Sequence, residues 1–280
     1  MRWLALHAPA FVTDPLIWLI SFFYACQTTR PSTHASGLYL ERVFQRPAGL
    51  RERHKHAHCF AHVFLDRVKL LTSGVDTFQI EANGQQLIED QHKTGRGGVL
   101  LGAHFGSFEA LRSFDNTLPG LRVRYLMFPE HAPASTALLN ELNADTASQI
   151  ISLSDGPQAM LEVHEALDKG EFVAFLGDRQ PGTTTRSQPV SFLGAPINLP
   201  TSPYIAAIAA QVPLFLCIAP RLGKNYYGIE FSELYDGAPV PRTERSERIA
   251  KLAQIYADHL EYLCRRYPYN WFNFFDIWNQ

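Results

Sequence analysis

The sequence has few cysteines and little net charge, and it lacks a long hydrophobic run. Its 280 residues include only 4 cysteines, which lie far apart and form no Cys-X-X-Cys motif. That spacing excludes a disulfide framework and favours a reduced, cytosolic environment. The formal net charge of -2 gives no indication of nucleic-acid binding. No nucleic-acid partner is therefore expected.

The chain also lacks internal repeats, Gly/Ser-rich linkers and low-complexity tracts. With 46% hydrophobic and 19% charged residues it is typical of a globular protein that is long enough to bury a substantial core. We expect an N-terminal helical segment at residues 1–75, followed by one continuous domain at residues 76–280.

The most apolar stretch, PLIWLISFFYAC, covers only residues 15–26. A helix needs about 20 apolar residues to cross a bilayer. Two interpretations therefore stay open: a buried N-terminal helix, or a helix that rests on a membrane surface; a true membrane span is a third. Arg and Lys outnumber Asp and Glu in residues 1–55, an excess that would attract anionic headgroups.

Hydrophobic periodicity predicts alternating helices and strands over residues 98–232. We expect strands at 98–103, 121–128, 171–177, 212–220 and 226–232, and helices at 33–46, 50–73, 84–98, 108–116, 133–145, 156–170, 201–211 and 242–266. This alternation indicates an α/β fold, with a central, mostly parallel or mixed sheet and helices on both faces.

A candidate active site lies in GGVLLGAHFGSFEALRSF, residues 97–114. His104 follows the strand 98–103 directly, in the crevice where α/β proteins place their sites. Glu109 would accept a hydrogen bond from one ring nitrogen of His104 and leave the other nitrogen as a base. The backbone N–H groups of Gly106 and Ser107 would stabilise an oxyanion. The alternative is that His104 caps a helix and Glu109 is an acidic residue of its first turn.

Further substrate-binding residues are expected after the strand 171–177 and in SFLGAPINLP, residues 191–200. Asp178 and Arg179 should open onto the same crevice as His104, with Arg179 binding a phosphate of donor or acceptor. The alternative is a structural Asp178–Arg179 network. Phe192 and Gly194, with the helix 202–211, would line an apolar acyl groove, or would be ordinary core.

Two other features have competing interpretations. His54, His58 and His62 share a helix face, but no acidic or cysteine ligand completes a zinc site, so a solvated, partly basic face is favoured. The aromatic tail from Trp271 to Trp278 would lie at a membrane interface or pack against the sheet.

The motifs also carry a family resemblance. GGVLLGAHFGSFEALR resembles the HxxxxD/E block of the lysophospholipid acyltransferase superfamily, most closely the branch of lipid A late acyltransferases. Residues 173–221 and the ending RRYPYNWFNFFDIW, residues 265–278, resemble later blocks of that branch. Among its members the chain looks most like the shorter enzymes of aryl polyene pathways.

The resemblance implies a dyad in which His104 is the general base and Glu109 orients it. The donor would be a thioester of acyl carrier protein or coenzyme A, and the acceptor a hydroxyl group of a lipid or saccharide. No metal, other cofactor or covalent acyl-enzyme is expected, and the protein would be peripheral on the cytoplasmic face of the bacterial inner membrane. The alternatives are a lipid A acyltransferase proper, a thioester hydrolase, or a catalytically silent relative that binds a carrier or lipid.

Overall fold

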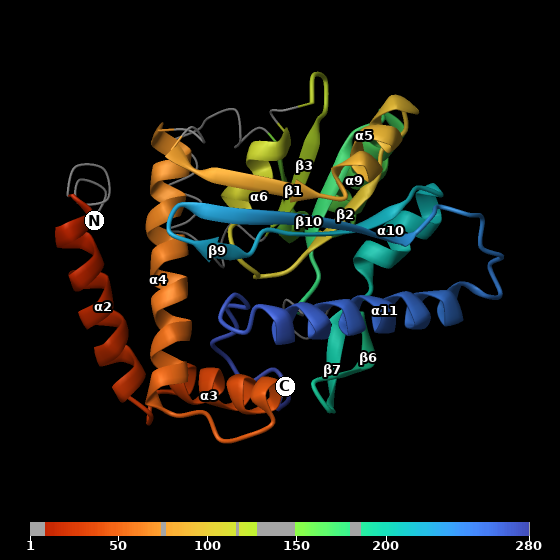
Figure 1. Ribbon diagram of the computed structural model, residues 1–280. Helices are drawn as coiled ribbons and strands as arrows, with labels where there is room; N and C mark the ends of the chain where they lie inside the picture. The colour runs from red at the N-terminus through yellow and green to blue at the C-terminus, as the bar shows by residue number, and fades with distance from the viewer. Residues whose placement is uncertain (1–8, 74–76, 116–117, 128–148, 180–185, 280) are drawn as a thin grey trace.

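The structure, a computed structural model, describes residues 9–73, 77–115, 118–127, 149–179 and 186–279 (Figure 1). Three helices precede the sheet: α2 (Ala10–Cys26), α3 (Pro31–Phe44) and α4 (Leu50–Ser73). The helix expected at residues 133–145 lies outside the described residues.

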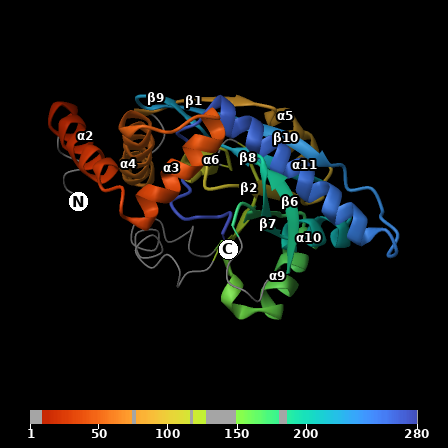
Figure 2. The same ribbon diagram turned by 90° about the horizontal axis from the view of Figure 1, so that it is seen from below.

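Helix α2 lies along α4 at the outer edge of the molecule, as both ribbon views show (Figures 1 and 2). The buried residues of α2 are small: Thr13, Ser21 and Ala25. Its large apolar side chains are exposed instead: Phe11, Val12, Leu16, Trp18, Leu19, Ile20 and Phe23. The structure therefore disagrees with a buried N-terminal helix. No described helix is long and apolar enough to cross a bilayer.

One mixed, mostly parallel sheet forms the centre of the molecule. Its strand order is β1-β10-β8-β2-β5-β3-β4, with β9 beside β10. The strands are β1 (Gln79–Asn83), β2 (Val99–Gly102), β3 (Val123–Met127), β4 (Ile150–Ser152), β5 (Phe172–Leu176), β8 (Leu214–Ile218), β9 (Arg221–Gly223) and β10 (Tyr226–Tyr235). β10 runs antiparallel to β8 and β9, and the other neighbouring pairs of this sheet are parallel.

The central strands are buried on both faces, which confirms the predicted layers. In β2, Val99 and Leu101 point into one hydrophobic core, and Leu100 points into another. The first core lies under α9 (Pro157–Asp168), α10 (Ser202–Ala210) and α11 (Arg245–Arg266). The second lies under α4, α5 (Gln85–Lys93) and α6 (Phe108–Asp115). A 3₁₀ turn, η3 (Leu153–Asp155), leads into α9.

The sequence analysis missed the short strands β1, β4 and β9, and it also missed a separate hairpin. That hairpin consists of β6 (Ser187–Phe192) and β7 (Ala195–Pro200). Its two-residue turn places Leu193 at φ 49° and Gly194 at φ 78°, the left-handed conformations that match the twist of a tight hairpin.

Candidate active site

His104 and Asp178 lie side by side just beyond two neighbouring parallel strands. β2 ends at Gly102 and β5 at Leu176, and these two residues are register partners. Two residues farther along each strand, His104 and Asp178 therefore meet at the same edge of the sheet. His104 Nδ1 lies 2.9 Å from Asp178 Oδ1, and the backbone N–H of His104 donates to Oδ2 over 3.0 Å.

Asp178 is fully buried and is held as an anion. The indole Nε1–H of Trp271 donates a further hydrogen bond to Oδ2 over 2.9 Å. Burial alone would raise the pKa of Asp178, but the charges of His104 and Arg179 and the two side-chain hydrogen bonds hold that pKa well below its usual range. Because a carboxylate only accepts, Nδ1 of His104 carries a proton, and neutral His104 keeps Nε2 as an acceptor.

The C-terminal segment, residues 270–275, forms one wall of the site. The N–H of Phe272 donates to the carbonyl of His104 over 2.7 Å, and Gly106 N–H donates to the carbonyl of Asn270 over 2.9 Å. Trp271 is fully buried, as the packing interpretation of the aromatic tail requires. The sequence analysis noticed this tail but did not connect it to His104.

A buried histidine supports Trp271 from α4. The Nε2 of His56 lies 2.8 Å from the carbonyl oxygen of Trp271, and its Nδ1 lies 2.8 Å from Ser36 Oγ. Burial lowers the pKa of His56 to about 4, so this ring is neutral at pH 7. It donates to Trp271 and accepts from Ser36, which links α3, α4 and the C-terminal segment.

Glu109 has a different partner from the predicted one. Ser107 caps α6 by accepting a hydrogen bond from the N–H of Ala110 over 3.1 Å, and this places Glu109 in the first helical turn. There Glu109 Oε1 lies 2.6 Å from Arg67 Nε of α4. The sequence analysis matched His104 with Glu109 by proximity in the chain, whereas Nδ1 is bonded to Asp178 from the neighbouring strand.

The predicted oxyanion donors are also engaged elsewhere. Gly106 N–H donates to Asn270, and Ser107 N–H donates to the carbonyl of Ala219 over 2.8 Å. Gly106 adopts φ 66°, and a Cβ there would lie 1.8 Å from the Ala219 oxygen. The glycine is therefore required by the close approach of this turn to the chain after β8, and its N–H is not available to a substrate.

A cavity of about 390 Å³ opens beside the His104–Asp178 pair. His104, Glu109, Arg67 and Arg179 provide its polar lining. The rest is mainly apolar and aromatic: Phe60, Val63, Phe64, Ala103, Phe105, Gly106, Phe108, Leu176, Phe272, Phe274 and Phe275. Such a cavity, largely apolar with a few convergent polar groups, is typical of a small-molecule or acyl-chain site.

The substrate-binding prediction for Asp178 is wrong, because this carboxylate is fully buried behind His104. The structural alternative holds for it, although its partners are His104 and Trp271 as well as Arg179. Arg179 does line the cavity. Its Nη2 donates to the carbonyl of Phe272 over 2.6 Å, and its guanidinium lies 4.7 Å from the centre of the Phe275 ring.

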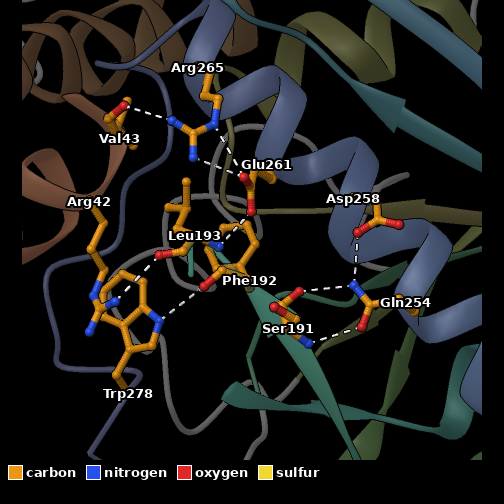
Figure 3. Close-up of polar contacts among 10 residues, drawn as sticks. All are labelled: Arg42, Val43, Ser191, Phe192, Leu193, Gln254, Asp258, Glu261, Arg265 and Trp278. Atoms are coloured by element: carbon orange, nitrogen blue, oxygen red, sulfur yellow. Dashed lines mark hydrogen bonds and ion pairs between the residues drawn. The ribbon is translucent and has the colours of Figure 1, made fainter. Parts of the chain in front are cut away.

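Phe192 and Gly194 do not line the His104 cavity. Phe192 is fully buried against Trp271 and Trp278, and Gly194 forms the hairpin turn. Figure 3 shows the hairpin held on one side by α11, where Glu261 accepts from the N–H of Leu193. Arg42 and Trp278 contact it on the other side. The core alternative was correct for Phe192.

The helix face of His54, His58 and His62 is not solvated throughout as expected, because His62 is buried. Among the residues that the structure describes, no three His, Cys, Asp or Glu side chains are placed to hold a metal ion.

The model of a family described as bacterial lipid A biosynthesis acyltransferase matches residues 67–280 of the chain. This range begins at Arg67 and includes both His104 and Asp178. No curated protein matches the chain.

Proposed function

Because the chain belongs to the bacterial lipid A biosynthesis acyltransferase family, we propose that it transfers an acyl chain from a thioester donor to a hydroxyl group of a lipid or saccharide acceptor. The observation that carries this proposal is the placement of His104, held by Asp178, on the wall of a largely apolar cavity. A base beside apolar surface suits a reaction between an acyl chain and a hydroxyl group.

In the proposed reaction, Nε2 of His104 takes the proton of the acceptor hydroxyl while its oxygen attacks the thioester carbonyl. The new C–O bond forms and the C–S bond breaks, and the leaving thiolate takes the proton back from the imidazolium. Asp178 fixes the tautomer and stabilises the imidazolium. Arg67 and Arg179 place positive charge on the cavity wall, where it would favour the tetrahedral oxyanion.

The finer assignments follow from the same surfaces. The aromatic wall formed by Phe60, Phe64 and the C-terminal segment would hold a fatty or polyene acyl chain carried by acyl carrier protein or coenzyme A. The exposed apolar side of α2 would rest on the cytoplasmic face of the inner membrane. The resemblance to aryl polyene enzymes favours a donor that carries a polyene chain. The alternative is a lipid A acyltransferase proper.

The test is release of free thiol from an acyl carrier thioester, with and without membrane lipid extract. We expect lipid-dependent release, with product recovered as an acylated lipid. His104→Ala should lower the rate by about 10²–10⁴-fold through loss of a positioned base. The matched control is His164→Ala on the surface of α9, which should leave the rate unchanged.

Each alternative predicts another outcome. Release that is the same without lipid and yields free acid would identify a thioester hydrolase. Binding of the carrier with no release by the wild-type protein would identify a catalytically silent relative. Fatty and aryl polyene thioesters, tested side by side, decide the class of acyl chain.

A further inference from the structure

A second cavity, of about 440 Å³, lies between α2 and α4 and shares no lining residue with the His104 cavity. Its lining combines Asp14, Pro15 and Trp18 of α2 with His58 and His62 of α4. Arg221 of β9 and Lys224, which follows β9, complete it. The acyl-transfer proposal uses none of these residues.

Two imidazoles, those of His58 and His62, face this cavity. The His58 and His62 rings contact each other edge to face, with centres 4.4 Å apart. His62 is 8% exposed. Within the part of the chain that the structure describes, neither ring forms a hydrogen bond, although His54, one turn earlier, faces the carbonyl of Trp18. Their ring nitrogens can therefore bond to a ligand that enters the cavity.

Two ion pairs surround these imidazoles. Arg221 is held from behind by Asp66, whose Oδ2 lies 3.4 Å from Arg221 Nε and also accepts from Tyr227. Lys224 Nζ lies 2.9 Å from Asp14 at the exposed rim. Burial, together with the charges of Arg221, His58 and Lys69, lowers the pKa of His62 to about 4, against an opposing effect of Asp14.

We propose that this cavity binds a phosphate group. Arg221 and Lys224 supply the charge that a phosphate needs, and the neutral imidazoles of His58 and His62 each supply an N–H donor. Both imidazoles then gain an acceptor, and each cation gains one beside its carboxylate. A metal ion would instead be repelled by Arg221 and Lys224.

The phosphate has two possible sources, a lipid headgroup or a soluble phosphate ester. Pro15 and Trp18 belong to the helix whose outer side exposes its apolar residues, so a lipid phosphate would reach the cavity from the surface on which α2 rests. This proposal does not depend on the acyl-transfer reaction.

The experiment uses inorganic phosphate as the soluble probe and phosphatidylcholine vesicles with and without phosphatidic acid as the lipid probe. Imidazole ¹⁵N signals report phosphate binding, and co-sedimentation reports vesicle binding. We expect one or both probes to engage the site, and Lys224→Gln and His62→Gln to weaken the engagement about tenfold each. The matched controls, Lys169→Gln for charge and His164→Gln for an imidazole outside the cavity, should leave it unchanged.

The outcomes separate the sources. Phosphate that shifts the His58 and His62 signals and competes with vesicles shows a general phosphate site. Phosphatidic acid vesicles that bind through Lys224 and His62 without such competition identify a lipid phosphate. The proposal is overturned if neither probe binds, or if the cavity variants and their controls weaken binding equally. The ¹⁵N signals of the other histidines confirm that each variant is folded.

Discussion

Two carboxylates lie near His104, and their surroundings differ. Asp178 comes from the end of a central strand, is fully buried, and accepts from the backbone and ring of His104 and from Trp271. Glu109 comes from the first turn of α6, lines the cavity, and has Arg67 of α4 as its ion-pair partner. One carboxylate is built into the sheet edge, and the other joins two helices at the cavity wall.

This difference gives the two carboxylates different roles: Asp178 is suited to orient the imidazole of His104, and Glu109 is suited to respond to charge in the cavity. A carboxylate with three N–H donors has little freedom, so it can fix the tautomer and plane of an imidazole. A carboxylate on the cavity wall can respond to charge that develops during a reaction, but its position depends on two helices. The general lesson is that residue spacing identifies neighbours in the chain, whereas strand register decides which side chains meet.

The comparison is tested most strongly by Asp178→Asn beside Glu109→Gln. We expect Asp178→Asn to lower kcat/KM by about 10³-fold, because the asparagine amide favours the tautomer with the proton on Nε2 and removes the base. Glu109→Gln keeps the His104–Asp178 pair, so its loss should be about tenfold smaller. Steady-state thiol release measures both.

Asp258→Asn, on the surface of α11, controls for the loss of one negative charge. Equal losses in the two site variants, or a larger loss in Glu109→Gln, would return the orienting role to Glu109.

Acid should destabilise the fold around the His104–Asp178 pair through the buried side chain of His56. The pKa of this buried histidine is about 4 in the folded protein and about 6.5 in the unfolded chain, so the unfolded state binds more protons between these values. Its stabilising contribution is complete above pH 6.5 and is lost as the pH falls. Between pH 6.5 and 4, the free energy of unfolding should decrease by about 3 kcal/mol from this group.

Urea unfolding at a series of pH values measures this slope. His62 also has a pKa of about 4, so the contribution of His56 is the difference between wild type and His56→Gln. Parallel curves for the two proteins would show that His56 does not couple folding to pH in this range.

The sequence predicted the elements of the site better than their pairing. The buried strands before His104 and Asp178 are recognisable as apolar runs. The contact between His104 and Asp178 depends on β2 and β5 being neighbours in register, which one sequence does not state. Glu109 was preferred because of its place in the first helical turn and because of the family resemblance, but its ion-pair partner is Arg67 of α4.

Other errors have local signals that were overlooked. In the hairpin, Val190, Phe192, Ile197 and Leu199 are buried at every second position, a strand pattern on both sides of a Leu-Gly turn. The role of Trp271 has no such signal, because its partner Asp178 lies 93 residues away in the chain. The bridge between Phe105 and Trp271 and the backbone hydrogen bonds beside it bring the C-terminal segment to the site.

Trp271→Phe should have the smallest effect, because it removes one of the donors to Asp178 and leaves the others. A carboxylate with one donor fewer attracts the imidazolium proton more strongly, so the acid limb of the kcat/KM profile should move to higher pH, and the rate below that limb should decrease about tenfold. Trp278→Phe is the matched control. This variant also removes an indole near the C-terminus. The Nε1–H of Trp278 donates to the carbonyl of Phe192 instead of to Asp178, so the variant should lower stability without moving the acid limb. If both variants lose stability and neither moves the pH profile, Trp271 only fills space, and the orientation of His104 depends on Asp178 without its help.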